Sequence, residues 1–138
     1  MRAFAHERQL TGLDHARLSS LLNSSRTSLP ASLADTAREV IDTADIVDST
    51  AIAPTVVTMR TRARLRRPGG DELEVVLCYP EEANAAEGRI SVLSPLGLSL
   101  LGATAGQTIE WQGPDGEVHR AQIDQIVFQP EAEGDYLS

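Results

Sequence analysis

The sequence of 138 residues predicts an α+β fold: a short N-terminal antiparallel helical hairpin, followed by a mostly antiparallel β-domain wrapped around one short helix. Two helix-start signals precede apolar residues at helical spacing between positions 11 and 47. From position 56 onward, apolar and polar residues alternate as they do in half-buried strands. A leucine-rich segment that begins with Ser-Pro and ends with Gly lies between these strands and predicts the enclosed helix.

The first part of the chain predicts the hairpin. Thr11-Gly-Leu-Asp14 fits a capping box that opens one helix, and Ser32-Leu-Ala-Asp35 fits a second. Behind the second box, apolar residues repeat at spacings of four and three, which predicts a coiled-coil-like stripe. The stripe consists of Leu33, Ala37, Val40, Ala44 and Val47. Residues 1–10 show no periodicity and are expected to form a loose tail, so the hairpin is assigned residues 11–53.

Residues 54–138 are assigned to the β-domain. Pro54 favours extended backbone before it and marks the boundary. The turn sequences Arg67-Pro-Gly-Gly and Gly113-Pro-Asp-Gly separate predicted strands. Strands are expected over residues 56–66, 72–79, 90–93, 108–112 and 117–128.

The short helix has its own start and stop signals. Ser94 can cap it by accepting from a free backbone N–H, and Pro95 fits the first helical position, where its missing donor costs nothing. Gly102 supplies the left-handed residue that closes such a helix. These signals predict a packing unit without chemistry of its own.

Composition excludes several classes of protein. The net charge of −8 argues against binding nucleic acid by electrostatics alone, because phosphate contacts need clustered cations. The chain has no lysine, so it lacks a residue that a P-loop requires. No run of about 18 apolar residues predicts a membrane span. The three histidines have no zinc-site spacing, and the single cysteine, Cys78, suits a reducing cytoplasm; we expect no metal, no cofactor and a cytoplasmic location.

Ser94-Pro-Leu-Gly97, followed by Leu101-Gly102, resembles the C-terminal domain of the bacterial GreA/GreB transcript-cleavage factors, which has an FKBP-like fold. Three further segments of the chain resemble the regulators of nucleoside diphosphate kinase, which are shorter relatives of these factors. The segments are Val56-Val-Thr-Met59, Leu77-Cys-Tyr-Pro80 and Gln129-Pro-Glu131-Ala-Glu-Gly134-Asp-Tyr136-Leu. The resemblance covers residues 54–138 strongly and the helical region weakly.

The resemblance implies a non-enzymatic regulator of transcription elongation that binds RNA polymerase. By this resemblance, Ser94, Pro95, Leu96 and Gly97 contact the rim of the polymerase secondary channel, and the short hairpin points inward. The chain would compete with longer Gre-type factors without stimulating RNA cleavage, and would affect nucleoside diphosphate kinase indirectly. We expect a monomer that has no sequence-specific contact with nucleic acid.

Asp35 and Glu39 have two interpretations. In the Gre factors, acidic residues at the hairpin tip are thought to help hold Mg²⁺ in the polymerase active centre, and oxygen ligands suit that ion. Alternatively, Asp35 caps its helix and Glu39 solvates a surface. The two acids are four residues apart and lack the Asp-x-x-Glu spacing of the cleavage factors, which argues against cleavage.

Four arginines at alternate positions predict a basic strand face: Arg60, Arg62, Arg64 and Arg66. This face either docks onto an acidic partner or a phosphate backbone, or is a solvated surface that discourages edge-to-edge pairing. Glu72 and Glu74 on the next strand are available as cross-strand partners in the second case.

Two other functions stay open. Peptidyl-prolyl isomerase activity is suggested only by the FKBP-like fold, and fold does not carry function. Such activity needs an aromatic-lined pocket, whereas the chain has five aromatic residues in all. Direct binding to a kinase partner is neither supported nor excluded by the sequence.

Overall fold

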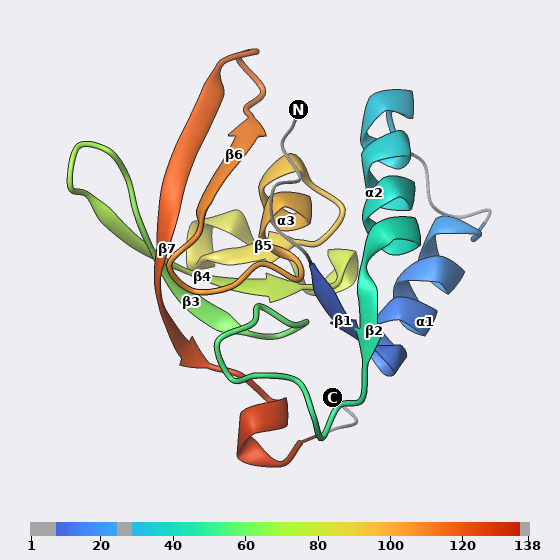
Figure 1. Cartoon of the computed structure of the whole chain (residues 1–138). Helices are drawn as coiled ribbons and strands as arrows, with labels where there is room; N and C mark the ends of the chain where they lie inside the picture. Colours follow the sequence, from blue (N-terminus) through green and yellow to red (C-terminus); the bar gives the residue numbers. More distant parts are fainter. Residues whose placement is uncertain (1–7, 25–28, 136–138) are drawn as a thin grey trace.

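The computed structural model describes residues 8–24 and 29–135 and confirms the α+β class. Figure 1 shows a curled β-sheet on one side of the molecule and two helices, α1 (Gly12–Leu22) and α2 (Ala31–Thr43), on the other. A third helix, α3 (Pro95–Leu100), lies between them and contacts both α2 and the sheet. Within the described residues, no helix has the length and apolar character that crossing a bilayer requires.

The main sheet has five strands in the order β5-β4-β3-β7-β6. Their bounds are β3 (Arg62–Arg66), β4 (Glu72–Cys78), β5 (Arg89–Ser91), β6 (Thr108–Gln112) and β7 (Val118–Phe128). Neighbouring strands are antiparallel except β4 and β5, which run parallel. The described part of the domain also has three short 3-10 helices: η1 (Pro80–Glu82), η2 (Ala85–Glu87) and η3 (Glu131–Glu133).

One hydrophobic core joins the hairpin to the sheet. Leu18 of α1 and Val40 of α2 belong to the same buried cluster as Leu100 and Leu101 at the end of α3. Each of these side chains is at most 2% exposed. Burying a side chain of this size contributes about 1.5–3 kcal/mol, so the hairpin is packed onto the β-domain instead of standing free of it.

The prediction of a loose tail over residues 1–10 is wrong where the structure describes it. The strand β1 (Gln9–Thr11) pairs in parallel with β2 (Asp45–Val47), which follows α2. Leu10, the middle residue of β1, is fully buried in the core that the hairpin shares with the sheet. The strand is too short to show a periodicity that sequence reasoning can use. Residues 1–7 lie outside the described residues.

Arg8 holds this N-terminal strand against α3. Its Nη1 donates to the carbonyl oxygens of Leu98 and Leu101 at 2.5 and 2.7 Å. These carbonyls lie at the end of α3, where helical carbonyls have no partner within the helix. The guanidinium group therefore closes α3 in addition to Gly102, whose positive φ of 77° confirms the predicted left-handed residue.

Replacing Arg8 with methionine is expected to lower the free energy of unfolding by about 2 kcal/mol, because hydrogen bonds to charged groups contribute about 1.5–3 kcal/mol. Methionine keeps most of the apolar stem and removes the donors. Urea denaturation measures the change, and Arg38→Met, at an exposed position of α2, is the matched control. Equal stability of the two variants would show that Arg8 does not hold the strand.

The start of α1 agrees with one half of the predicted capping box, because the Asp14 carboxyl accepts from the Met59 backbone N–H instead of the Thr11 backbone N–H. Thr11 is the N-cap, and its Oγ1 accepts from the backbone N–H of Asp14 at 3.1 Å. The predicted second box at Ser32 and Asp35 is wrong, because α2 begins two residues earlier, with Pro30 as N-cap and no side-chain cap. The fixed φ of proline suits the entry to a helix and sets this earlier start.

The end of α2 also differs from the prediction. The helix stops at Thr43, because Ala44 adopts extended backbone with ψ of 146° and leads into β2. Ala37 and Val40 of the predicted stripe are buried as expected. Val47, its last member, is a strand residue that pairs with Thr11. The hairpin is thus closed at its base by a parallel strand pair.

The strand predicted over residues 56–66 is shorter in the structure, where only Arg62–Arg66 form β3. Thr58 and Thr61 close a turn before it: the Thr58 N–H donates to Thr61 Oγ1 at 2.9 Å, and the Thr61 N–H donates to the Thr58 carbonyl at 3.1 Å. Arg60, inside this turn, has φ of 68°. It is therefore not part of the strand face that carries the other three arginines.

Candidate functional site

The Ser94–Gly97 segment forms the first turn of α3. Ser94 is the N-cap: its Oγ accepts from the Gly97 N–H at 3.0 Å and donates to the Ser91 carbonyl at 2.7 Å. Pro95 occupies the first helical turn, as predicted. The sequence signals therefore placed this turn correctly, and the serine hydroxyl is already committed to the backbone.

Within this segment, two residues are structural and two face outward to different degrees. Gly97 is buried, and a Cβ on it would overlap the carbonyl oxygen of Ser91. Pro95 is exposed and Leu96 is partly exposed. A partner that contacts this turn would consequently meet Pro95 and Leu96, whereas Ser94 and Gly97 fix the position of the turn.

The arginine face is paired with carboxylates in the structure. On the face of the sheet opposite α3, Arg66 contacts Glu72 and Asp124 at 3.0 and 3.2 Å. The predicted cross-strand partner Glu74 serves two arginines, at 3.1 Å from Arg62 and 3.6 Å from Arg64. All these arginine side chains are between 38 and 49% exposed, so each pair is worth about 0–1 kcal/mol. The face is a charged network and not a row of free cations.

Arg60 lies apart from this network, at the entrance to a shallow pocket. It donates to both carboxylate oxygens of Glu82, from Nε at 3.3 Å and from Nη2 at 2.9 Å. Its guanidinium carbon lies 5.7 Å from the centroid of the Tyr79 ring, a distance at which cation and ring attract. The backbone turn with positive φ is what directs the side chain to these partners.

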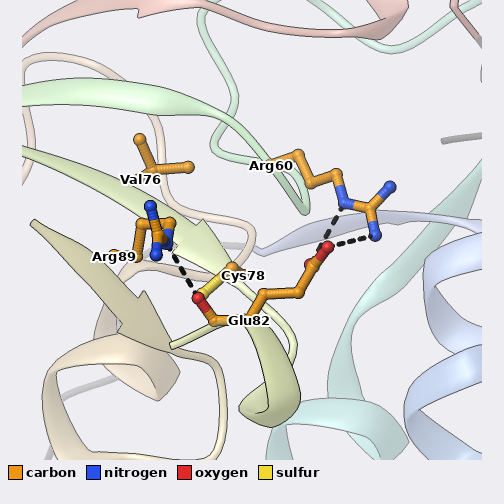
Figure 2. A pocket seen from close by; sticks show the side chains of 5 residues that line it. All are labelled: Arg60, Val76, Cys78, Glu82 and Arg89. Atoms are coloured by element: carbon orange, nitrogen blue, oxygen red, sulfur yellow. Dashed lines mark hydrogen bonds and ion pairs between the residues drawn. The ribbon is translucent and has the colours of Figure 1, made fainter. Parts of the chain in front are cut away.

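The pocket has a volume of about 370 Å³ and is lined by Arg60, Val76, Cys78, Glu82 and Arg89. Figure 2 shows the two arginines on opposite sides of Glu82, with Val76 on the side of Arg89 and Cys78 next to Glu82. Nε of Arg89 donates to the backbone carbonyl of Glu82 at 2.9 Å. Burial raises the pKa of the Cys78 thiol, so the thiol is a neutral wall of the pocket and not an activated nucleophile.

Asp35 and Glu39 are both exposed on α2 and are not brought into a ligand set. Burial lowers the pKa of the Arg8 guanidinium, and the charge of Glu39 partly offsets this effect. Glu39 therefore lies towards the attachment of the N-terminal strand. Across residues 8–24 and 29–135, no group of three or more His, Cys, Asp or Glu side chains is arranged to hold a metal ion.

A buried carboxyl group links α1 to the β-domain. Asp14 is 2% exposed, and its Oδ2 accepts from the backbone N–H of Met59 at 3.1 Å. Burial raises the pKa of the Asp14 carboxyl to about 6, although the hydrogen bond from Met59 lowers the same pKa. Glu131, whose Oε1 accepts from the Thr58 hydroxyl at 2.6 Å, raises the same pKa by its charge. The Asp14 hydrogen bond links the hairpin to the Thr58–Thr61 turn, and the Thr58 hydroxyl links the same turn to the C-terminal segment at Glu131.

Sequence reasoning missed the second role of Asp14, the pocket residues Val76, Glu82 and Arg89, and the exposure of Phe128. Asp14 was recognised only as part of a capping box. The pocket depends on the positive φ of Arg60, for which a non-glycine residue gives no sequence signal. Phe128 is 43% exposed because β7 is irregular at its end, which alternation alone does not reveal.

Comparison of the sequence with known proteins identifies relatives of this chain. The sequence model of the family described as "Transcription elongation factor, GreA/GreB, C-term" matches residues 52–127. Over 130 residues the chain is 32% identical to the regulator of nucleoside diphosphate kinase of Escherichia coli strain K12, which covers 93% of this chain and 94% of that protein. Transcription elongation factor GreA of Chlorobium phaeobacteroides is 36% identical over 81 residues, covering 57% of this chain and 51% of that protein.

A solved structure agrees with these sequence matches. The chain titled "Prokaryotic transcription elongation factor GreA/GreB from Nitrosomonas europaea" superposes with a TM-score of 0.75 and 34% identity, over 89% of this chain and 99% of that chain. The relatives are regulators or transcription factors by name, which fits the expectation of a transcription-factor-like regulator related to the Gre factors. The chain belongs to the family of regulators of nucleoside diphosphate kinase, whose β-domain is the C-terminal domain of the GreA/GreB elongation factors.

Proposed function

We propose that this chain binds bacterial RNA polymerase in the cytoplasm and regulates transcription elongation from the rim of the secondary channel, without stimulating RNA cleavage. Its effect on nucleoside diphosphate kinase would be indirect, through transcription. The observation that carries the proposal is the exposed first turn of α3, on the β-domain that this chain shares with GreA/GreB factors.

The first turn of α3 suits a protein contact because its position is fixed before binding. Ser94 and Gly97 hold the turn against β5 through backbone contacts, and Pro95 has few conformations to lose. A preorganised surface loses little entropy when a partner docks. Pro95 and the exposed part of Leu96 are therefore the side chains that we assign to the polymerase contact.

The hairpin supports the second half of the proposal, that cleavage is not stimulated. Its helices have 11 and 13 residues, about 16 and 20 Å at 1.5 Å per residue. Asp35 and Glu39 lie one turn apart on α2, both exposed, and within the described residues they belong to no group of three or more side chains that could hold a metal ion. A short hairpin packed against its own domain would occupy the entrance of the channel without bringing a carboxylate pair to the active centre.

Binding to core RNA polymerase tests the proposal, with Pro95→Glu as the disrupting variant. Glutamate is acceptable in the first turn of a helix, so the variant should fold while it places a charge in the contact. We expect at least tenfold weaker binding, measured by pull-down and by competition with a GreA factor. Pro114→Glu, at an exposed proline in the β6–β7 turn, is the matched control and should bind like the wild type.

Two outcomes contradict the proposal. If the wild-type chain does not bind core polymerase, the proposed function is wrong. If it binds and Pro95→Glu binds equally well, the assignment of the α3 turn is wrong. RNA cleavage by stalled polymerase on addition of the wild-type chain would overturn the second half. The isomerase and kinase-binding alternatives have no specific observation in their favour among the described residues, and they stay predictions.

A further inference from the structure

One row of side chains on the outer face of the sheet, the face opposite α3, differs from the paired rows beside it. The strand registers place Phe128 opposite Arg62, Arg62 opposite Val76, and Val76 beside Arg89. Residues that face each other in a sheet lie on the same side of it. This mixed row (Phe128, Arg62, Val76 and Arg89) therefore alternates apolar and cationic side chains across four strands.

An irregularity in β7 puts the aromatic residue into this row. The register shifts between Ala63, which faces Ile126, and Arg62, which faces Phe128. Val127 is the extra residue, and Val127 and Phe128 are 40 and 43% exposed. Such bulges re-aim side chains and are found next to functional sites. Here the bulge turns a phenylalanine outward in a chain with only five aromatic residues.

The mixed row leads directly into the pocket. Val76 and Arg89 belong to both, and the pocket adds Arg60, the buried Cys78 and Glu82, whose carboxylate is bound by Arg60 (Figure 2). Arg60 reaches it from a turn in which its backbone has a φ of 68°, a conformation that residues other than glycine rarely adopt. The surface thus consists of a hollow over Val76 and Cys78, with Arg89 on one side and the Arg60–Glu82 ion pair on the other.

The guanidinium groups of Arg62 and Arg89 keep N–H donors for a partner. Arg62 donates one hydrogen bond, to Glu74, and Arg89 contacts the Glu82 carbonyl and the Glu87 carboxylate. A guanidinium group carries five N–H donors, and these two side chains are 48 and 44% exposed. Each can donate to a further carboxylate without giving up its present partner.

We propose that the mixed row and its pocket are a second docking surface, which binds a protein segment with acidic residues on either side of one apolar side chain. The apolar side chain fills the hollow over Val76, and its acidic neighbours bond to Arg62 and Arg89. The net charge of −8 disfavours an acidic segment over most of the surface, so its carboxylates are expected where Arg62 and Arg89, although paired with Glu74 and Glu87, keep N–H donors. The inference rests on the proposed function, since the segment is assigned to RNA polymerase.

Site-specific photo-crosslinking tests the contact in the full chain. A benzophenone amino acid replaces Phe128 in one variant and Val118 in the control, an exposed apolar position at the other end of the same strand, 62% exposed. With core polymerase, we expect a crosslink to a polymerase subunit from position 128 and none from position 118. Mass spectrometry of the crosslinked peptide should find a segment rich in Asp and Glu.

A charge variant supplies the quantitative test. Arg62→Gln combined with Arg89→Gln is expected to weaken polymerase binding at least tenfold, because the two substitutions together remove two charge-assisted hydrogen bonds to the partner. Glu74 keeps Arg64 in this variant, and thermal unfolding checks its fold. Arg120→Gln, whose partner Glu110 lies on the β6–β7 hairpin, is the control.

The outcomes separate the two proposals. The second surface is wrong if the Arg62→Gln, Arg89→Gln double variant binds like the wild type and position 128 gives no crosslink. The proposed function still stands in that case, provided that the wild type and Arg120→Gln bind polymerase and Pro95→Glu does not. A crosslink to RNA or DNA in an elongation complex, or to a polymerase segment without acidic residues, also overturns the second surface. If the wild type does not bind polymerase, both proposals fall.

Discussion

Replacing Gly97 with alanine is expected to lower the free energy of unfolding by about 3 kcal/mol or more, or to prevent folding. A Cβ at this position would overlap the Ser91 carbonyl oxygen, and it would lie 2.8 Å from the Ser91 carbonyl carbon and 2.9 Å from the Val92 Cα. All three atoms are backbone, so no side chain can rotate away. To make room, α3 would have to move off the sheet and open the core around Leu100.

Gly69→Ala is the matched control for this prediction. No atom lies within 4 Å of a Cβ built on Gly69, and its φ is not positive. Its free energy of unfolding should change by less than about 0.5 kcal/mol. Urea denaturation followed by circular dichroism measures both variants. Wild-type stability of Gly97→Ala would mean that α3 does not pack on the Ser91 backbone as described, and the proposed docking turn would lose its support.

The turn around Gly97 also shows what sequence reasoning can reach. Ser94, Pro95 and Gly102 act through rules that need only neighbouring residues: a cap, a first helical position and a left-handed stop. The structure agrees with all three. The strands at residues 108–112 and 72–78 were predictable for the same reason, since alternation within one segment defines them.

The N-terminal strand was not predictable in this way. Its stability comes from β2 and α3, which lie far along the chain, and three residues carry too little pattern to indicate a strand. The same limit applies to Arg60. Its neighbours suggested an alternating strand, but the Thr58–Thr61 turn is favoured by contacts with Glu131 and Leu77 that only the folded chain brings near.

In the candidate site, too, features set by neighbouring residues were predictable and features set by the folded sheet were not. The position of the α3 turn was predictable from the sequence because its capping signals are local, and its role as a contact, implied by the resemblance, stays a prediction. The arginine face was predicted as a pattern, yet the sequence left open whether it was paired, and the structure pairs Arg62, Arg64 and Arg66 with Glu72, Glu74 and Asp124. The mixed row depends on a bulge and on strand order, which are properties of the sheet and not of any one segment.

The buried carboxyl group of Asp14 is expected to make the free energy of unfolding fall as the pH rises from about 4 to about 6. Burial raises the pKa of this group from its ordinary value of 3.8 to about 6. Between these two values the folded protein holds a proton that the unfolded chain has released, so raising the pH favours unfolding. The contribution is full below pH 3.8 and is lost by pH 6, and it amounts to about 3 kcal/mol.

Asp14→Asn isolates this contribution from the other carboxyl groups. The asparagine oxygen can still accept from the Met59 N–H, but the side chain cannot ionise. At pH 7.5 we expect this variant to be more stable than the wild type by up to about 3 kcal/mol, and near pH 4 the difference should vanish. Asp35→Asn, at an exposed position of α2, should change stability by less than about 0.5 kcal/mol.

The position of Asp14 gives this titration a structural consequence. Its partner Met59 and its charged neighbour Glu131 belong to the β-domain side, whereas Asp14 belongs to α1. Ionisation should therefore weaken the attachment of the hairpin before it unfolds the sheet. Amide hydrogen exchange at Met59 is expected to accelerate between pH 5 and 7 in the wild type, beyond the intrinsic effect of pH, and not in Asp14→Asn. Equal protection of Met59 in both proteins at every pH would show that Asp14 is not the titrating link between hairpin and domain.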